Sequence, residues 1–356
     1  MPKVIEELKA KLDSIKRNNI TAYHILTECA DILSIKFYDM EEAMKLLITC
    51  TGRRVELVER LSECFDIVAV DASDRCAIST YIGQLEDSKN IIFRTVPSCR
   101  DDRYIDAMVS LCQSEKVDLL VPLYEPEFLV LCANRHRFEE LGTRLVLSDT
   151  EVIRICNDKL LMQEFFEAND IRTPKLKDGA PAIVKPVNGM GSEGIFKVDT
   201  DEELVAAKVL SKGPVIVQEL VGGTEYTIDV LCDFDGNVVL AIPRIRVEVR
   251  DGEVSKSRVV KNDKVIAATK DLVAKLNRRG KVVGPLTIQC FMNDEDEIIF
   301  IEVNPRFGGG VPLSLEASDY VGLFLRMALG EVIEETVTDF KEVSTYRFIK
   351  GLYRYE

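Results

Sequence analysis

Three side chains that carry oxygen donors lie at the matched ends of a predicted β-hairpin, residues 285–310. Two apolar runs flank an acidic turn in PLTIQCFMNDEDEIIFIEVNPRFGGG, which predicts two antiparallel strands. Because side chains alternate along a strand, Glu302 and Asn304 share one face, and Gln289 faces them from the other strand. A carboxylate and two amide carbonyls suit a hard cation such as Mg²⁺. Arg306 follows directly, and a guanidinium binds phosphate or carboxylate oxygens well.

The same hairpin has a plainer interpretation, which the sequence leaves open. Asn304-Pro305 can simply end a strand, and the three glycines at 308–310 can form a flexible turn. The acidic residues at 294–297 are best explained as a solvated hairpin tip, and no metal is assigned to them.

A second stretch, AIVKPVNGMGSEG at residues 182–194, is typical of phosphate binding. Lys185 ends an apolar strand, and backbone N–H groups of the following Gly- and Ser-rich loop can approach phosphates closely. It is not a Walker motif, because no Gly-Lys-Ser/Thr opens a helix. A mobile hairpin tip would explain the glycines. It would not explain Lys185, nor Lys159 in the first turn of the predicted helix at 157–169.

A third stretch, VIVQELVGGTEYTIDV, is a β run interrupted by two glycines between Glu219 and Glu225. Its exposed backbone could bond a base edge, and its carboxylates could bind ribose hydroxyls. Taken alone, a connection between subdomains is the plainer explanation.

Positive charge is concentrated in IPRIRVEVR, residues 242–250. Alternation along a strand places Arg244 and Arg246 on one face, and Arg258 follows after a turn. We hypothesise that these three arginines bind a carboxylate substrate. The alternative is a solvated sheet face in which Glu248 neutralises its neighbours.

Composition limits the chemistry. Lys plus Arg number 46 against 60 Asp plus Glu, so the net charge of -14 argues against nucleic acid or an anionic membrane as partner. The sequence has no apolar run long enough for a transmembrane helix and no signal-peptide core, so a cytoplasmic location is expected. Two histidines and ten scattered cysteines make a zinc site or a Ser/His/Asp triad improbable.

The chain must position these residues with three predicted parts. Residues 1–43 show helical periodicity and predict a helical N-terminal extension. Residues 44–149 alternate apolar strands with amphipathic helices, which predicts a doubly wound parallel sheet with ligands beyond the carboxyl ends of its strands. Residues 150–356 hold the stretches described above, and glycines bracketing residues 178–222 predict a mobile lid.

Together and in this order, these stretches resemble the ATP-grasp superfamily, most closely its carbamoyl-phosphate-synthase-like branch, over about residues 45–330. The resemblance implies an α/β fold in which a pre-ATP-grasp domain precedes a two-lobed ATP-grasp α+β domain with a lid. Two features depart from the family pattern. Gln289 stands where many members have an acidic residue, and a single ATP-grasp unit makes full carbamoyl phosphate synthesis unlikely.

The resemblance also implies ATP and two Mg²⁺ ions as cofactors, with Mn²⁺ as an alternative ion. It assigns the phosphates to Lys159, Lys185, Met190, Gly191 and Ser192. It assigns the adenosine to Glu219, Val221 and Glu225. It assigns the metal ions to Gln289, Glu302 and Asn304. Catalytic roles fall to Lys185 and Arg306.

The implied reaction is ligation of a small carboxylate or amino acid to an amine or ammonia through an acyl phosphate. The alternative is an ATP-binding regulatory or partner-activated module without turnover of its own. A homodimer is left open.

Overall fold

The computed structural model describes residues 43–85, 90–189, 193–211, 213–250, 253–348 and 350–355. Residues 44–356 form one compact unit. The predicted helical extension up to residue 42 lies outside the described residues, as do Met190, Gly191 and Ser192 of the predicted phosphate loop. In the part of the chain that is described, no helix is both long and apolar enough to span a membrane.

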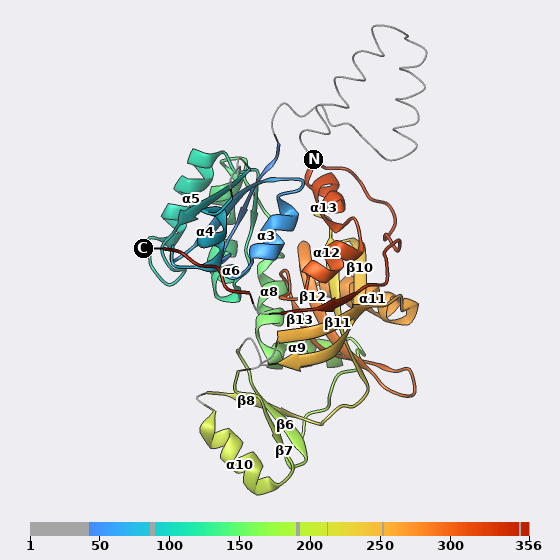
Figure 1. Ribbon diagram of the computed structural model, residues 1–356. Helices are drawn as coiled ribbons and strands as arrows, with labels where there is room; N and C mark the ends of the chain where they lie inside the picture. The colour runs from blue at the N-terminus through green and yellow to red at the C-terminus, as the bar shows by residue number, and fades with distance from the viewer. Residues whose placement is uncertain are drawn as a thin grey trace, which may run out of the picture. The chain divides into compact units, whose positions relative to one another are not determined.

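Five parallel strands form the first sheet, in the order β3-β2-β1-β4-β5. The strands are β1 (Lys45–Ile48), β2 (Asp66–Asp71), β3 (Ile91–Thr95), β4 (Leu119–Val121) and β5 (Arg144–Leu145). The connecting helices are α3 (Val55–Leu61), α4 (Ala77–Ile82), α5 (Tyr104–Glu115), α6 (Glu125–Ala133) and α7 (Arg135–Glu139). The sheet lies among the blue to green elements of Figure 1, beside the labelled helices α3 to α6. The predicted doubly wound sheet is therefore confirmed.

The central strand β1 is apolar from Leu46 to Ile48 because both of its faces are buried. Leu46 and Ile48 pack into a core that includes residues of α3, whereas Leu47 packs into a second core with residues of α5. Both faces are buried, so alternation with polar residues is absent. The strand order reverses between β1 and β4, and a ligand crevice is expected beyond the carboxyl ends of strands at such a point.

Three elements of this part of the chain differ from what the sequence pattern predicts. The sequence pattern predicts a single helix over residues 127–141, but the structure has two, α6 and α7. The break is at Asn134, which leaves the helical conformation at φ -111° and ψ 13° and whose side chain donates to the carbonyl of Val130 at 2.9 Å. The strand β3 and helix α4 were not predicted, since β3 is only half-buried and α4 is six residues long.

Helices α8 (Thr150–Asn157) and α9 (Lys159–Ala168) lead to a three-stranded sheet in the order β7-β6-β8. Its elements are β6 (Ala182–Pro186), β7 (Phe196–Val198), α10 (Asp201–Leu210) and β8 (Val215–Gln218). It has a small core of its own, in which Val184 and Val198 pack against Leu204 of α10. The sheet with α10 lies at one end of the molecule in Figure 1 and occupies the residues predicted to form the lid. Its movement remains a prediction.

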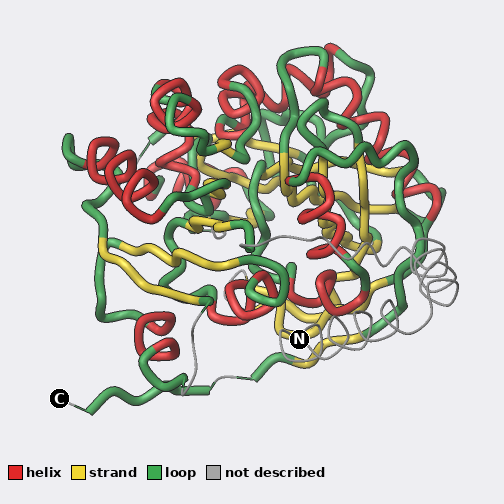
Figure 2. The backbone as a smooth tube through the Cα atoms, turned by 90° about the horizontal axis from the view of Figure 1, so that it is seen from above, coloured by secondary structure: helices red, strands yellow, loops and turns green. Residues whose placement is uncertain are grey.

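Six antiparallel strands form the largest sheet, in the order β13-β12-β9-β10-β11-β14. Figure 2 shows the strands of the chain in yellow, with helices in red around them. The strands are β9 (Thr224–Cys232), β10 (Val238–Arg250), β11 (Glu253–Val259), β12 (Gly284–Met292), β13 (Ile298–Asn304) and β14 (Ser344–Tyr346). The helices are α11 (Asp263–Asn277), α12 (Pro312–Ala317) and α13 (Tyr320–Ala328). The sequence pattern predicts one closing helix through residue 325, but the structure has two, α12 and α13, divided at Ser318, which has extended backbone dihedrals.

The core of the six-stranded sheet continues into the first sheet. Phe65, which precedes β2, packs on Phe324 of α13 with ring centroids 5.3 Å apart. The tail after β14 also reaches the first sheet, where Gln84 donates to the carbonyl of Tyr353 at 2.8 Å. The first sheet and the six-stranded sheet therefore share one continuous hydrophobic core.

Candidate functional site

A cavity of about 670 Å³ lies where the parts of the chain meet. Its walls come from the strand ends of the first sheet, the three-stranded sheet, the six-stranded sheet and the glycines at 308–310. The lining is mostly charged and polar, which suits a highly charged ligand.

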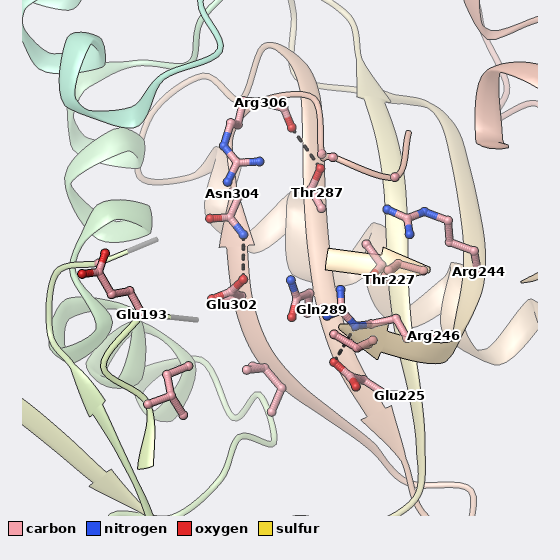
Figure 3. A pocket seen from close by; sticks show the side chains of 18 of the residues that line it. Glu193, Glu225, Thr227, Arg244, Arg246, Thr287, Gln289, Glu302, Asn304 and Arg306 are labelled. Atoms are coloured by element: carbon pink, nitrogen blue, oxygen red, sulfur yellow. Dashed lines mark hydrogen bonds and ion pairs between the residues drawn. The ribbon is translucent and has the colours of Figure 1, made fainter. Parts of the chain in front are cut away.

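The predicted hairpin is β12 and β13, and its register places the oxygen donors as expected. Gln289 pairs with Glu302, and Thr287 pairs with Asn304. Asn304 Nδ2 donates to Glu302 Oε1 at 2.9 Å, which leaves the side-chain oxygen Oδ1 of Asn304 available as a metal ligand. Figure 3 shows these side chains grouped on the face of the hairpin that lines the cavity. The predicted convergence is therefore present.

These donors fit Mg²⁺ when a polyphosphate supplies further oxygens. Glu302 is the one carboxylate among the three side chains, and Mg²⁺ is commonly held by one or two protein carboxylates together with substrate phosphates. Among the described residues, no group of three or more His, Cys, Asp or Glu side chains could hold a metal ion without such help.

Both predicted phosphate-binding lysines line the cavity. Lys185 of β6 is 8% exposed, and its ammonium donates to Gln218 at 3.1 Å. Burial lowers the pKa of Lys185, an effect that the nearby carboxylate of Glu302 opposes. Lys159 begins α9, where Asp158 caps the helix, and its ammonium donates to the carbonyl of Gly189 at 3.2 Å. The ammonium of Lys159 is thus held at Gly189, after β6, whereas the ammonium of Lys185 is held at Gln218, at the end of β8.

Arg306 joins the two main parts of the chain. Its Nη2 lies 2.8 Å from Glu125 Oε1, and these side chains are 17% and 14% exposed. Glu125 begins α6 at the carboxyl end of β4, the switch point of the first sheet. Arg54, after β1, donates to the carbonyls of Phe307 and Gly308 at 3.2 and 3.1 Å. The segment after β13 is therefore fixed by two residues of the first sheet.

Two of the three glycines of this segment, Gly308 and Gly310, are packed closely, which argues against a merely flexible turn. A Cβ on Gly308 would lie 2.7 Å from the hydroxyl of Thr287. A Cβ on Gly310 would lie 2.6 Å from Nη1 of Arg244. Contacts this short do not occur for real side chains, so the segment passes the cavity wall as bare backbone.

Arg244 of β10 is 2% exposed and forms a buried ion pair with Asp229 of β9. Its Nε lies 2.7 Å from Asp229 Oδ2, and Ser314 donates to the same oxygen at 2.6 Å. Its Nη1 makes no hydrogen bond within the described structure, although it is buried and the residue lines the cavity. An unmade bond to a buried guanidinium is unfavourable, so this donor is suited to an anionic ligand.

Arg246 also lines the cavity and lies 2.9 Å from Glu225, its Nε facing Oε1 (Figure 3). The two atoms form an ion pair, but they are not aligned as a hydrogen bond. Burial lowers the pKa of Arg246, and the charge of Glu225 opposes this. The predicted ribose ligand Glu225 therefore reaches the cavity, already paired with a cation.

Arg258 does not join the other two arginines. In β11 it pairs with Ile245, so it shares the face of Ile245 rather than that of Arg244 and Arg246. Its side chain is half-exposed and faces Glu342 at 3.5 Å. Register shifts on both sides of Glu248 also interrupt the alternation that the sequence pattern assumed.

The predicted adenine contacts lie outside the cavity lining. The backbone N–H of Glu219 donates to the carbonyl of Lys175 at 2.9 Å, and its carboxylate accepts from the Lys175 N–H at 3.0 Å. Val221 follows in the connection to β9 and does not line the cavity either. Their roles toward adenine remain predictions.

The structure adds lining residues that were not assigned to the site. Arg54 and Glu125 come from strand ends of the first sheet, where the order of strands predicts ligands but not which residues bind them. Arg347 follows β14, which reaches the cavity by pairing with β11. No local sequence signal marks that long-range pairing.

Sequence comparison identifies two domains. The family model of the ATP-grasp domain matches residues 156–310, and that of the PylC-like, N-terminal domain matches residues 46–146. The predicted resemblance to the ATP-grasp superfamily is therefore confirmed, whereas the closer resemblance to its carbamoyl-phosphate-synthase-like branch stays a prediction.

Comparison with solved structures shows the same fold at low sequence identity. N5-carboxyaminoimidazole synthetase from Staphylococcus aureus, complexed with ADP, has a TM-score of 0.65 and 16% identity over 86% of this chain and 83% of that chain. A biotin carboxylase–βγ-ATP complex from Campylobacter jejuni has a TM-score of 0.63 and 16% identity over 84% and 74%. L-amino acid ligase from Bacillus licheniformis has a TM-score of 0.60 and 18% identity over 81% and 74%.

Proposed function

We propose that this chain, whose residues 156–310 are an ATP-grasp domain, is an ATP- and Mg²⁺-dependent ligase that joins a small carboxylate to an amine. The observation that carries the proposal is the grouping of Glu302 and its amide neighbours with Lys185 and Arg306 in one cavity. Similar folds occur in a synthetase complexed with ADP and in an L-amino acid ligase, which supports both the nucleotide and the reaction class.

The nucleotide phosphates are bound by Lys159 and Lys185 and by backbone N–H groups of the glycine loop. Two cationic side chains offset the phosphate charge, and the loop contributes donors without side-chain bulk. Gln289, Glu302 and Asn304 would hold Mg²⁺, which supplies charge neutralisation of the phosphates when bound. The side chains of the hairpin then orient the γ-phosphate toward the cavity.

The carboxylate substrate binds at Arg244 and Arg246, beside Arg306. Nη1 of Arg244 has no partner among the described residues, and Asp229 holds the rest of the guanidinium in place. A carboxylate oxygen attacks the γ-phosphorus, ADP leaves, and an acyl phosphate forms. The amine nitrogen then attacks the acyl carbon, the C–O bond to phosphate breaks, and the nitrogen loses a proton. Positioning and charge supply most of the acceleration in such a reaction.

The test is ADP release by the full-length chain with ATP, Mg²⁺, and pools of amino acids and small carboxylates. We expect release that depends on one carboxylate and one amine, and mass spectrometry of the product should show the new C–N bond. Tight nucleotide binding without release in any pool would contradict the ligase assignment and support a regulatory ATP-binding module instead.

A further inference from the structure

A row of hydrogen-bonded side chains begins at Lys185 and continues through Gln218 to Gln163 of α9. Lys185 Nζ donates to Gln218 Oε1 at 3.1 Å, and Gln218 Nε2 donates to Gln163 Oε1 at 2.8 Å. Gln163 Nε2 then donates to Glu167 at 2.7 Å and to the carbonyl of Pro174 at 3.2 Å. Gln163 and Gln218 are 3% and 5% exposed, so water does not substitute readily for these bonds.

The groups at the two ends of this row determine how the amides of Gln218 and Gln163 are oriented. An ammonium can only donate, so Gln218 must turn its oxygen to Lys185 and its NH₂ group to Gln163. A carboxylate and a backbone carbonyl can only accept, so Gln163 must turn its NH₂ group to Glu167 and Pro174. Both ends therefore agree on one orientation of each amide, and neither amide can flip without losing bonds at both of its ends.

The row connects different elements around the phosphate site. Gln218 ends β8, which pairs with the strand β6 that carries Lys185. Gln163 lies in α9, four residues after Lys159, so both residues project from one helix face. Both phosphate-binding lysines are thus connected to helix α9. Lys159 is its first residue, and Lys185 is linked to it by hydrogen bonds through the side-chain amides of Gln218 and Gln163.

We propose that Gln163 and Gln218 are positioning residues that orient the ammonium of Lys185 for phosphate. The inference rests on the proposed function, because it assumes that Lys185 binds the nucleotide phosphates. A carboxylate in place of Gln218 would hold the ammonium but cancel its charge. A neutral amide occupies one of the three ammonium donors and leaves the charge and the other two donors for the ligand.

Because Lys185 is buried, its hydrogen bond to Gln218 matters for the position of its ammonium. A buried ammonium without an acceptor is strongly disfavoured, so loss of the amide contact would turn or displace the side chain. Gln163 does not line the large cavity, and among the described residues its hydrogen-bonded link to Lys185 runs through Gln218, so we expect its effect on Lys185 to pass through that amide.

The test is a double-mutant cycle on the full-length chain, with calorimetry of Mg·ADP binding extended to millimolar dissociation constants. Gln163→Met keeps the side-chain volume and removes both amide groups. We expect it to weaken Mg·ADP binding about tenfold, the size of one hydrogen bond to a charged group. In a Lys185→Met background, the same substitution should change the dissociation constant less than about twofold, because coupled residues are not additive.

The controls separate the alternatives. Gln113→Met on the exposed face of α5 should leave Mg·ADP binding unchanged. If Gln163→Met does not fold, Gln163→Asn keeps an amide but is too short to reach Gln218, and it should give the same two results. Equal weakening in both backgrounds would overturn the inference and leave a purely structural role. No effect in either background would also overturn it, whereas an unmodified chain that does not bind Mg·ADP would contradict the proposed function itself.

Discussion

The buried ion pair of Arg244 and Asp229 gives a prediction whose size follows from the structure. The side chains are 2% and 1% exposed, and Ser314 also donates to Asp229. Asp229→Ala would leave the guanidinium buried without its partner. Removal of one partner from such a pair costs about 3–5 kcal/mol. We therefore expect Asp229→Ala to lower the free energy of unfolding by about that amount.

Equilibrium unfolding in urea measures the change, with the slope of the transition as a check that the unfolded state is comparable. Lys264→Ala is the matched control, because Lys264 and Asp296 also lie 2.7 Å apart but are 63% and 57% exposed. A pair this exposed contributes about 0–1 kcal/mol. Combining Asp229→Leu with Arg244→Met removes both charges and should recover most of the loss. A loss for Asp229→Ala no larger than for Lys264→Ala would refute the reasoning.

Three further predictions concern the cavity. Gly310→Ala would place a methyl group 2.6 Å from Nη1 of Arg244 and should lower the free energy of unfolding by about 1–3 kcal/mol. Gly213→Ala is the control, because a Cβ there meets open space and should leave the free energy of unfolding unchanged. Urea unfolding of both variants tests this. Arg246→Lys loses the planar fork and should raise the KM for the carboxylate much more than that for ATP, and equal rises would contradict the assignment. Hydrogen exchange over residues 178–222 should slow when an ATP analogue and Mg²⁺ bind, and unchanged exchange would argue against a lid.

Local patterns in the sequence predicted the hairpin and much of the site. The strands β12 and β13 are adjacent in the chain, and alternation alone places Glu302 opposite Gln289. Lys185 was found because a charged side chain at the end of an apolar strand needs an explanation. Arg258 was grouped with Arg244 by assuming regular alternation, and the register of β11 places it on the other face.

Contacts between distant residues were beyond the sequence patterns. The ion pair of Arg306 with Glu125 joins residues 181 positions apart, and the donor from Arg54 reaches Gly308 over 254 positions. The amide of Gln163 looked like an ordinary polar residue of a helix. Its role depends on how β8 packs against α9, which neither segment encodes alone.

The central claim is that the hairpin carboxylate serves an ATP-dependent reaction, and Glu302→Ala tests it most directly. ADP release should be measured with Mg²⁺ and the best substrate pool, alongside thermal unfolding and the control Glu295→Ala on the exposed tip of the same hairpin. The account predicts that Glu302→Ala abolishes release while the fold stays intact, and that Glu295→Ala retains both. Near-normal release by Glu302→Ala at ordinary Mg²⁺ concentrations would contradict it.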